Sequence, residues 1–228
     1  MCCERGGRLL FDALDFSVAP GAALTVVGPN GSGKTTLLRA LAGLTEAVIR
    51  HIAWNGMPVA VRSAPWRARL AYVGHKPGHK DELSAAENLE LASSLEGASA
   101  SDGERQRVLD AVGLGARSAL PVKRLSQGQK QRLALARLFL SPRELWLLDE
   151  PAAALDAAAR GLLAEILQRH LQRGGAAVIA THDRIEVPGA RMAELRLGGT
   201  AAHHAATRAI EADALAPKAP NACWREEP

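Results

Sequence analysis

The feature that most constrains this chain is a glycine-rich loop between an apolar run and a segment with helical periodicity. The loop reads Gly28-Pro29-Asn30-Gly31-Ser32-Gly33-Lys34-Thr35, which matches the pattern G-x-x-x-x-G-K-[ST]. Residues 23–27 before it are apolar, as in a buried strand, and residues 35–42 after it repeat with the helical period until Gly43. Strand, loop and helix in this order form the context that the pattern requires. We therefore expect an α/β fold around this loop.

The residue types of the loop predict that it binds the phosphates of a nucleotide. Glycines allow positive φ angles and close approach, so that successive N–H groups point at phosphate oxygens, and the following helix adds the positive end of its dipole. Lys34 is expected to reach the β- and γ-phosphates, and the Thr35 hydroxyl to bind Mg²⁺. The alternative is a glycine turn with a lysine nearby. The expected nucleotide contacts are Gly28, Pro29, Asn30, Gly31, Ser32, Gly33, Lys34, Thr35 and Thr36.

A second signal of phosphate chemistry is an apolar run that ends in two carboxylates. Residues 145–148 are Leu-Trp-Leu-Leu, and Asp149 and Glu150 follow them. A buried strand would hold Asp149 rigidly beside Mg²⁺, while Glu150 would lie nearer the γ-phosphate and polarise the attacking water. Taken alone, the run indicates only a strand that ends at the surface. Together with the phosphate loop, it predicts a site that hydrolyses a nucleotide.

Apolar runs alternate with helical segments along the chain, which favours a mostly parallel sheet covered on both faces. Residues 14–28, with Pro20-Gly21 as the turn, predict an antiparallel hairpin near the N-terminus. Residues 76–135 carry no clear strand and are expected to form a helical insert. Strands are expected at 51–54, 70–73 and 176–180, helices at 84–95, 106–112, 126–140 and 156–173, and a loop at 97–103. We predict one domain over 1–200 and a flexible, Ala-rich tail over 201–228.

Composition excludes several classes of protein. With 228 residues, 47% hydrophobic and 23% charged, the chain has enough apolar residues for a core and resembles neither a disordered chain nor a fibre. Its three cysteines predict no disulfide framework, which favours a reducing compartment. The net charge of +4 suits an anionic ligand, a nucleic acid or a membrane surface without choosing between them. No apolar run approaches the roughly 20 residues of a membrane span, and no signal segment is present, so we expect a cytoplasmic chain.

A pentapeptide between the phosphate loop and the acidic strand carries a family resemblance. Leu125-Ser126-Gln127-Gly128-Gln129, ahead of a helical segment, resembles the Leu-Ser-Gly-Gly-Gln signature of the ABC ATPase family, with Gln127 at the variable third position. The resemblance implies a head-to-tail homodimer with two ATP molecules between the protomers. In it, Ser126, the Gly128 backbone and the helix N-terminus clamp the γ-phosphate bound to the opposite protomer. The alternative is an ordinary serine cap followed by a flexible glycine.

Other elements of the ABC ATPase family follow in order, over about residues 9–197. Ala154-Leu155-Asp156 resembles the D-loop, which crosses the dimer interface, and Thr181-His182 matches the switch histidine, which contacts the γ-phosphate. The resemblance implies ATP hydrolysis with Mg²⁺. Lys34, Glu150 and His182 would be catalytic, and Thr35 and Asp149 would hold the metal.

Two departures from the family pattern concern the adenine contact and the coupling position. His75 stands where the family usually has a glutamine that touches Mg²⁺ and relays nucleotide state to the membrane partner; we assign coupling roles to His75 and Asp156. The alternative is a neutral replacement in which a water bridges His75 to Mg²⁺. Arg5 lies near the place of the aromatic residue that stacks on adenine, with Phe11 as the other candidate. Family members usually carry a strand ahead of that position, so we expect either a missing edge strand or further sequence before it.

The segment after His75 indicates a subfamily. The stretches Gly74-His75-Lys76-Pro77-Gly78-His79-Lys80 and Ser84-Ala85-Ala86-Glu87-Asn88-Leu89 resemble the ATPases of cytochrome c maturation. This implies a peripheral subunit on the cytoplasmic face of the inner membrane, with membrane-spanning permease partners and no nucleic-acid partner. Its work would be heme export or release of a heme-loaded chaperone. The alternatives are the ATPase of another ABC transporter, a soluble ABC ATPase, or a subunit that does not hydrolyse ATP.

Overall fold

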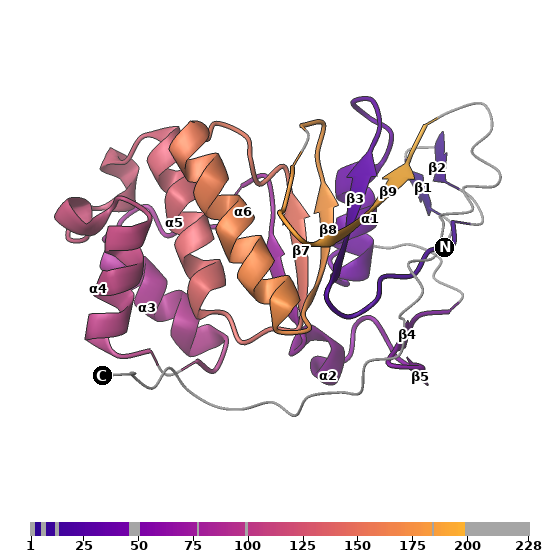
Figure 1. Ribbon diagram of the computed structural model, residues 1–228, viewed down its shortest axis with the longest axis horizontal. Helices are drawn as coiled ribbons and strands as arrows, with labels where there is room; N and C mark the ends of the chain where they lie inside the picture. Colours follow the sequence, from indigo (N-terminus) through magenta and orange to yellow (C-terminus); the bar gives the residue numbers. More distant parts are fainter. Residues whose placement is uncertain are drawn as a thin grey trace.

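The computed structural model describes residues 3–5, 8–11, 14–45, 51–76, 78–98, 100–183 and 185–198. Their central feature is a five-stranded sheet in the order β6-β7-β8-β3-β9, in which every neighbouring pair is parallel (Figure 1). The strands are β3 (Ala22–Val27), β6 (Leu70–Val73), β7 (Leu145–Asp149), β8 (Ala176–Ala180) and β9 (Arg191–Arg196). The α/β fold class is confirmed. The predicted tail over 201–228 lies outside the described residues, and the domain limits stay predictions.

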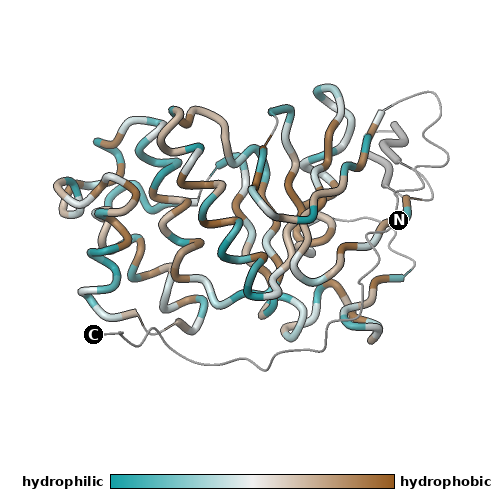
Figure 2. The backbone as a smooth tube through the Cα atoms, in the orientation of Figure 1, coloured by the Kyte–Doolittle hydropathy of each residue, from teal (hydrophilic) through white to brown (hydrophobic). Residues whose placement is uncertain are grey.

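Helices cover both faces of the sheet, as the apolar strands require. The helices of the described chain are α1 (Lys34–Leu41), α2 (Ala64–Arg67), α3 (Ala85–Leu95), α4 (Asp102–Ala111), α5 (Gln127–Leu140) and α6 (Ala157–Gln172), of which α1, α5 and α6 pack on the sheet. Leu24, Val26 and Leu147 point to the face that packs on α1, whereas Leu148 and Ile179 point to the opposite face, which packs on α5 and α6. Figure 2 shows brown segments along the central strands, and helices along which brown alternates with teal. None of the helices in the described part of the chain combines the length and the apolar character that crossing a membrane requires.

Between β6 and β7 the chain forms α3, α4, two 3₁₀ turns (Gly115–Arg117 and Val122–Arg124) and α5. These elements enclose a core of their own, centred on Leu89, Leu109, Leu114 and Leu133. Helix α5 belongs to both cores, because Leu133 faces this cluster while Leu135 and Leu138 face the sheet. The helix that carries the signature residues therefore joins the helical segment to the sheet.

An antiparallel pair of strands near the N-terminus is confirmed, but its predicted place over residues 14–28 is wrong. Asp15 makes only an isolated bridge, and β3 pairs instead with the parallel strands β8 and β9 on its two edges, which leaves no edge for a hairpin partner. The turn at Pro20-Gly21 does precede β3, where Gly21 has φ 74° and donates to the Gly175 carbonyl at 2.8 Å. The antiparallel pairs of the structure are β1 (Cys3–Arg5) with β2 (Arg8–Phe11), and β4 (Ala53–Trp54) with β5 (Met57–Pro58).

Other elements also differ from the prediction. Helix α4 begins inside the loop predicted over 97–103, because Ser101 accepts a hydrogen bond from the Glu104 N–H at 3.3 Å while Glu104 accepts one from the Ser101 N–H at 2.8 Å. This capping box was overlooked, whereas that of Ser84 and Glu87 was predicted and starts α3. Strand β9 was also missed, since its sequence Arg-Met-Ala-Glu-Leu-Arg carries charges at an edge of the sheet.

Candidate active site

The parallel register brings the predicted site residues to one edge of the sheet. Val26 of β3 pairs with Ala180 of β8, and Ala180 pairs in turn with Asp149 of β7. The chain continues from these three strand ends into the phosphate loop, Glu150 and His182. Residues separated by more than a hundred positions therefore converge, as expected at the carboxyl ends of parallel strands.

The phosphate loop has the conformation that glycine allows. Gly31 has φ 80° and Gly33 has φ 100°. At Gly28, a side chain would place its Cβ 2.3 Å from the Leu197 carbonyl oxygen, so the β9 end of the sheet closes against the loop. Lys34 is buried, and its Nζ donates to the Gly28 carbonyl at 2.7 Å and to the Pro29 carbonyl at 3.3 Å. The ammonium therefore sits inside the loop with one of its three donors left over.

The N-terminus of α1 is built to receive an anion. Gly33 caps it without a side chain, and its first turn holds no acidic residue, so no carboxylate competes for its free N–H groups. The Ser32 hydroxyl is buried and has no hydrogen-bond partner. Free N–H groups, an unpartnered hydroxyl and an ammonium in one concave loop match the acceptor oxygens of a polyphosphate.

Thr35 and Asp149 meet beside this loop. Thr35 Oγ1 donates to Asp149 Oδ1 at 3.0 Å, while the buried Oδ2 of Asp149 has no partner. Burial raises the pKa of the Asp149 carboxyl; the hydrogen bond from Thr35 opposes this, and the charge of Glu150 adds to it. Among the described residues, no group of three or more His, Cys, Asp or Glu side chains is placed to hold a metal. A hydroxyl and one orphaned carboxylate oxygen fit Mg²⁺, which takes few protein ligands and keeps phosphate and water oxygens.

Glu150 is held in an uncommon backbone conformation next to His182. It has φ 52°, and its N–H donates to the Ala180 carbonyl at 2.8 Å. Its Oε1 lies 3.0 Å from His182 Nδ1; the Glu150 side chain is 17% exposed and that of His182 is 64% exposed. The hydrogen bond and the charge of Glu150 raise the pKa of the His182 imidazole. The pair places Glu150, a candidate general base, beside the His182 imidazole, whose protonated form it favours, next to the phosphate loop.

The signature residues form the start of α5. Ser126 caps the helix by accepting from the Gln129 N–H at 3.2 Å, and Gln129 Oε1 accepts from the Ser126 N–H at 2.9 Å. A Cβ added at Gly128 would lie 3.1 Å from the Ala154 carbonyl oxygen, so the signature packs directly on the D-loop, residues 154–156. Leu125 is buried below, and Gln127 is exposed. The ordinary capping role of Ser126 is therefore real, and a second role toward phosphate stays a prediction.

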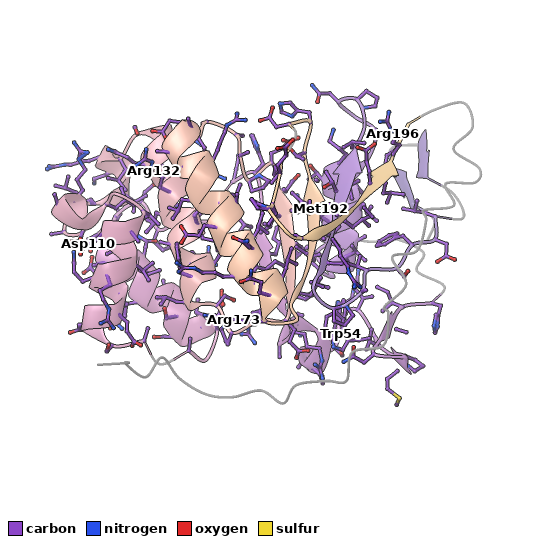
Figure 3. The ribbon with its side chains drawn as sticks, in the orientation of Figure 1. Trp54, Asp110, Arg132, Arg173, Met192 and Arg196 are labelled. Carbon is purple, nitrogen blue, oxygen red and sulfur yellow. The ribbon has the colours of Figure 1, made fainter. Side chains whose placement is uncertain are left out.

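Arg132 of α5, labelled in Figure 3, was not predicted as a site residue, and it contacts the other end of the D-loop. It forms an ion pair with Asp156, and Asp156 Oδ1 also accepts from the Ala159 N–H at 2.9 Å as the cap of α6. The hydrogen bond from the Ala159 N–H lowers the pKa of the Asp156 carboxyl most, and the charge of Arg132 lowers it further. Gln131 donates to the Pro151 carbonyl at 3.1 Å and is buried. Both residues lie just beyond the signature, but the sequence carries no signal for the contacts that they make.

The coupling and adenine positions are less constrained. His75 is exposed, and it follows β6 near Asp149, whose pKa its charge and its N–H lower. His79, to which we assigned no role, has Nε2 2.9 Å from the Lys130 carbonyl oxygen of α5. Arg5 belongs to β1, but its side chain lies outside the described residues. Its contact with adenine therefore stays a prediction.

A phosphate loop at the end of β3, an acidic strand β7 and a signature helix α5 define the class of nucleotide-binding subunits that drive transporters. The chain matches the ABC transporter family over residues 11–153 and belongs to it. It is 46% identical over 196 residues to the cytochrome c biogenesis ATP-binding export protein CcmA of Dechloromonas aromatica, covering 86% of this chain and 96% of that protein. The CcmA of Pseudomonas aeruginosa is 44% identical over 181 residues, with 79% and 89% covered.

Solved structures agree on the fold. A structure described as the ATP-binding subunit of an ABC transporter has a TM-score of 0.77 at 25% identity, covering 92% of this chain and 87% of that one. A putative ABC transporter ATP-binding protein from Pyrococcus furiosus has a TM-score of 0.71 at 22% identity, with 83% and 91% covered. The comparisons confirm both predicted resemblances: this is an ATP-binding ABC ATPase similar to the CcmA export proteins.

Proposed function

We propose that this chain is the ATPase of a heme-export complex in cytochrome c biogenesis and hydrolyses MgATP at the edge formed by β3, β7 and β8. The observation that carries the proposal is the convergence of Lys34, the Thr35–Asp149 pair and the Glu150–His182 pair on that edge. The matches to CcmA proteins support the assignment to cytochrome c biogenesis. Heme as the exported group follows from the subfamily resemblance.

Each residue has a distinct part in the proposed reaction. The loop N–H groups and Lys34 bind and orient the phosphates. Thr35 and Asp149 would hold Mg²⁺, which would neutralise phosphate charge when bound. Glu150 accepts a proton from, or orients, the attacking water, and His182 donates a hydrogen bond to the oxygens where negative charge develops. The raised pKa of His182 favours the charged, donating form.

We further propose that two copies of the chain close head to tail around two ATP molecules. Ser126 and Gln127 of the signature are exposed at the start of α5, and the D-loop packs against Gly128. This surface is available to a second copy. The same proposal places membrane-spanning permease subunits against the face around His75, and the complex on the cytoplasmic side of the inner membrane. No nucleic-acid partner is proposed.

Covalent heme staining of c-type cytochromes tests the function in cells. Cells that express only Glu150→Gln should lose the stained bands, and the parent chain should restore them. Glu144→Gln is the matched control, because Glu144 precedes β7, pairs with the exposed Arg69 and lies at the opposite end of that strand. Normal bands in cells with Glu150→Gln would refute the role in cytochrome c biogenesis. The assignment as an ATPase would then be tested separately, by ATP hydrolysis with the purified chain.

A further inference from the structure

Arg160 lies one turn into α6 and contacts two loops that border the candidate active site. Its Nε donates to the Leu155 carbonyl of the D-loop at 3.3 Å, and its Nη2 lies 3.0 Å from Asp183 Oδ2. Asp183 directly follows His182. We propose that Arg160 is a positioning residue, which fixes the loop of His182 against the D-loop and thereby presents the imidazole to the γ-phosphate. The inference rests on the proposed role of His182.

His182 needs such support because its own side chain is poorly enclosed. It is 64% exposed and is held at Nδ1 by Glu150. Strand β8 ends at Ala180, and Thr181 is wholly buried. The Thr181 hydroxyl accepts from the Asp183 N–H at 2.9 Å. Hydrogen bonds and burial thus fix Thr181 and Asp183 on the two sides of His182, and Arg160 holds the side chain of Asp183.

The fork of an arginine suits this task. Two N–H groups in one plane reach a carbonyl on one loop and a carboxylate on the other, which the single ammonium of a lysine cannot do in a fixed geometry. The Arg160–Asp183 pair is 47% and 29% exposed, and pairs of this kind contribute little to folding stability. Its loss should therefore disturb the placement of His182 far more than the stability of the chain.

Steady-state ATP hydrolysis by the purified full chain tests the inference. Arg160→Met should lower kcat about tenfold, since small misplacements of a catalytic group are costly, and should leave KM within about twofold and the melting temperature unchanged. Arg160→Lys should recover only part of the loss. Arg169→Met is the matched control, because Arg169 lies on the same helix in an ion pair with Glu165 and is 46% exposed. It should behave as the parent chain.

A double-mutant cycle separates a shared role from two independent ones. Asp183→Asn should lower kcat as Arg160→Met does, and the double variant should lose no more than either single variant. Full additivity, or a kcat within about twofold of the parent in Arg160→Met, would overturn the positioning role. An equal loss in Arg169→Met would do the same. Asp183→Asn also serves as the second probe if Arg160→Met folds poorly.

Titration of the His182 imidazole by NMR provides a readout that does not depend on catalysis. The groups that face it are Glu150, Asp183 and Lys34. Removing the charge of Arg160 would, by electrostatics alone, raise the pKa of His182, whereas loss of its position beside Glu150 would lower it. We expect the pKa to fall in Arg160→Met, and a rise would contradict the proposal. His182→Ala distinguishes a failure of the proposed role of His182 from a failure of the role of Arg160. If His182→Ala keeps the parent kcat, the role of His182 is refuted. If His182→Ala has a low kcat while Arg160→Met keeps the parent kcat, only the role of Arg160 is refuted.

Discussion

The Oε1 of Glu150 lies 3.0 Å from Nδ1 of His182, and the two residues follow neighbouring parallel strands whose last residues pair in register. Their contact is a consequence of sheet topology: β7 and β8 end at the same level, so Glu150, one residue beyond β7, meets His182, two residues beyond β8. The same edge carries the phosphate loop after β3. A proposed base, its histidine partner and the phosphate loop are thereby placed together by three strands.

Glu150→Gln should bind ATP like the parent chain, lose hydrolysis by about 100-fold or more, and accumulate as an ATP-bound dimer. Glutamine keeps the shape of the side chain but cannot accept the proton, so the closed state would persist. Light scattering after size exclusion, with and without MgATP, measures the dimer, and phosphate release measures the turnover. Hydrolysis at the parent rate would show that Glu150 is not the base.

Glu150→Gly should unfold less readily than Glu150→Gln, by about 1 kcal/mol, although both are inactive. Glu150 has φ 52°, a conformation that costs energy for a residue with a Cβ and none for glycine. The comparison with glutamine keeps hydrolysis absent in both proteins. Urea unfolding of the two variants without nucleotide measures the difference. Equal midpoints and slopes would mean that no strain is stored at this residue.

Much of the fold and the site could be predicted because the signals are local. The phosphate loop is contiguous in the sequence, and the apolar composition of residues 145–148 alone predicts that the strand leading to Asp149 is buried. By contrast, β9 was missed since a charged edge strand lacks that signature, and the hairpin over 14–28 was wrong because parallel partners far along the chain occupy both edges of β3. The contacts of Arg132 and Arg160 were beyond reach for the same reason: they join loops that only the tertiary fold brings together.

Lys34→Ala should lose ATP affinity by about tenfold or more. The buried ammonium is held at the phosphate loop by the Gly28 and Pro29 carbonyls, where it can form charge-assisted hydrogen bonds with phosphate oxygens. Fluorescence titration with a labelled ATP analogue measures the affinity. Lys123→Ala is the control, because Lys123 forms an exposed ion pair with Glu82. Undiminished affinity in Lys34→Ala would argue against the loop as the nucleotide site.

The stacked pair of His170 and Trp146 should make folding stability depend on pH. The rings are 3.8 Å apart and inclined by 8°, and His170 Nε2 lies 3.1 Å from the Ala176 carbonyl oxygen, so the neutral ring donates there. Burial, partly opposed by that hydrogen bond, lowers the pKa of His170 from 6.5 to about 4. The unfolded chain therefore takes up a proton first as the pH falls. Stability from this group is complete above pH 6.5 and is lost between pH 6.5 and about 4.

The loss from His170 should reach about 2.5 kcal/mol between roughly pH 7.5 and pH 4.5. Carboxylates titrate in the same range, so the parent chain must be compared with His170→Gln, which keeps a donor but does not ionise. Urea unfolding at both pH values gives four free energies. The difference between parent and variant should shrink at low pH, because only the parent pays for excluding a proton from the stack. If the two proteins lose the same free energy of unfolding on acidification, burial does not lower the pKa of His170, and the stacked pair contributes no pH dependence to stability.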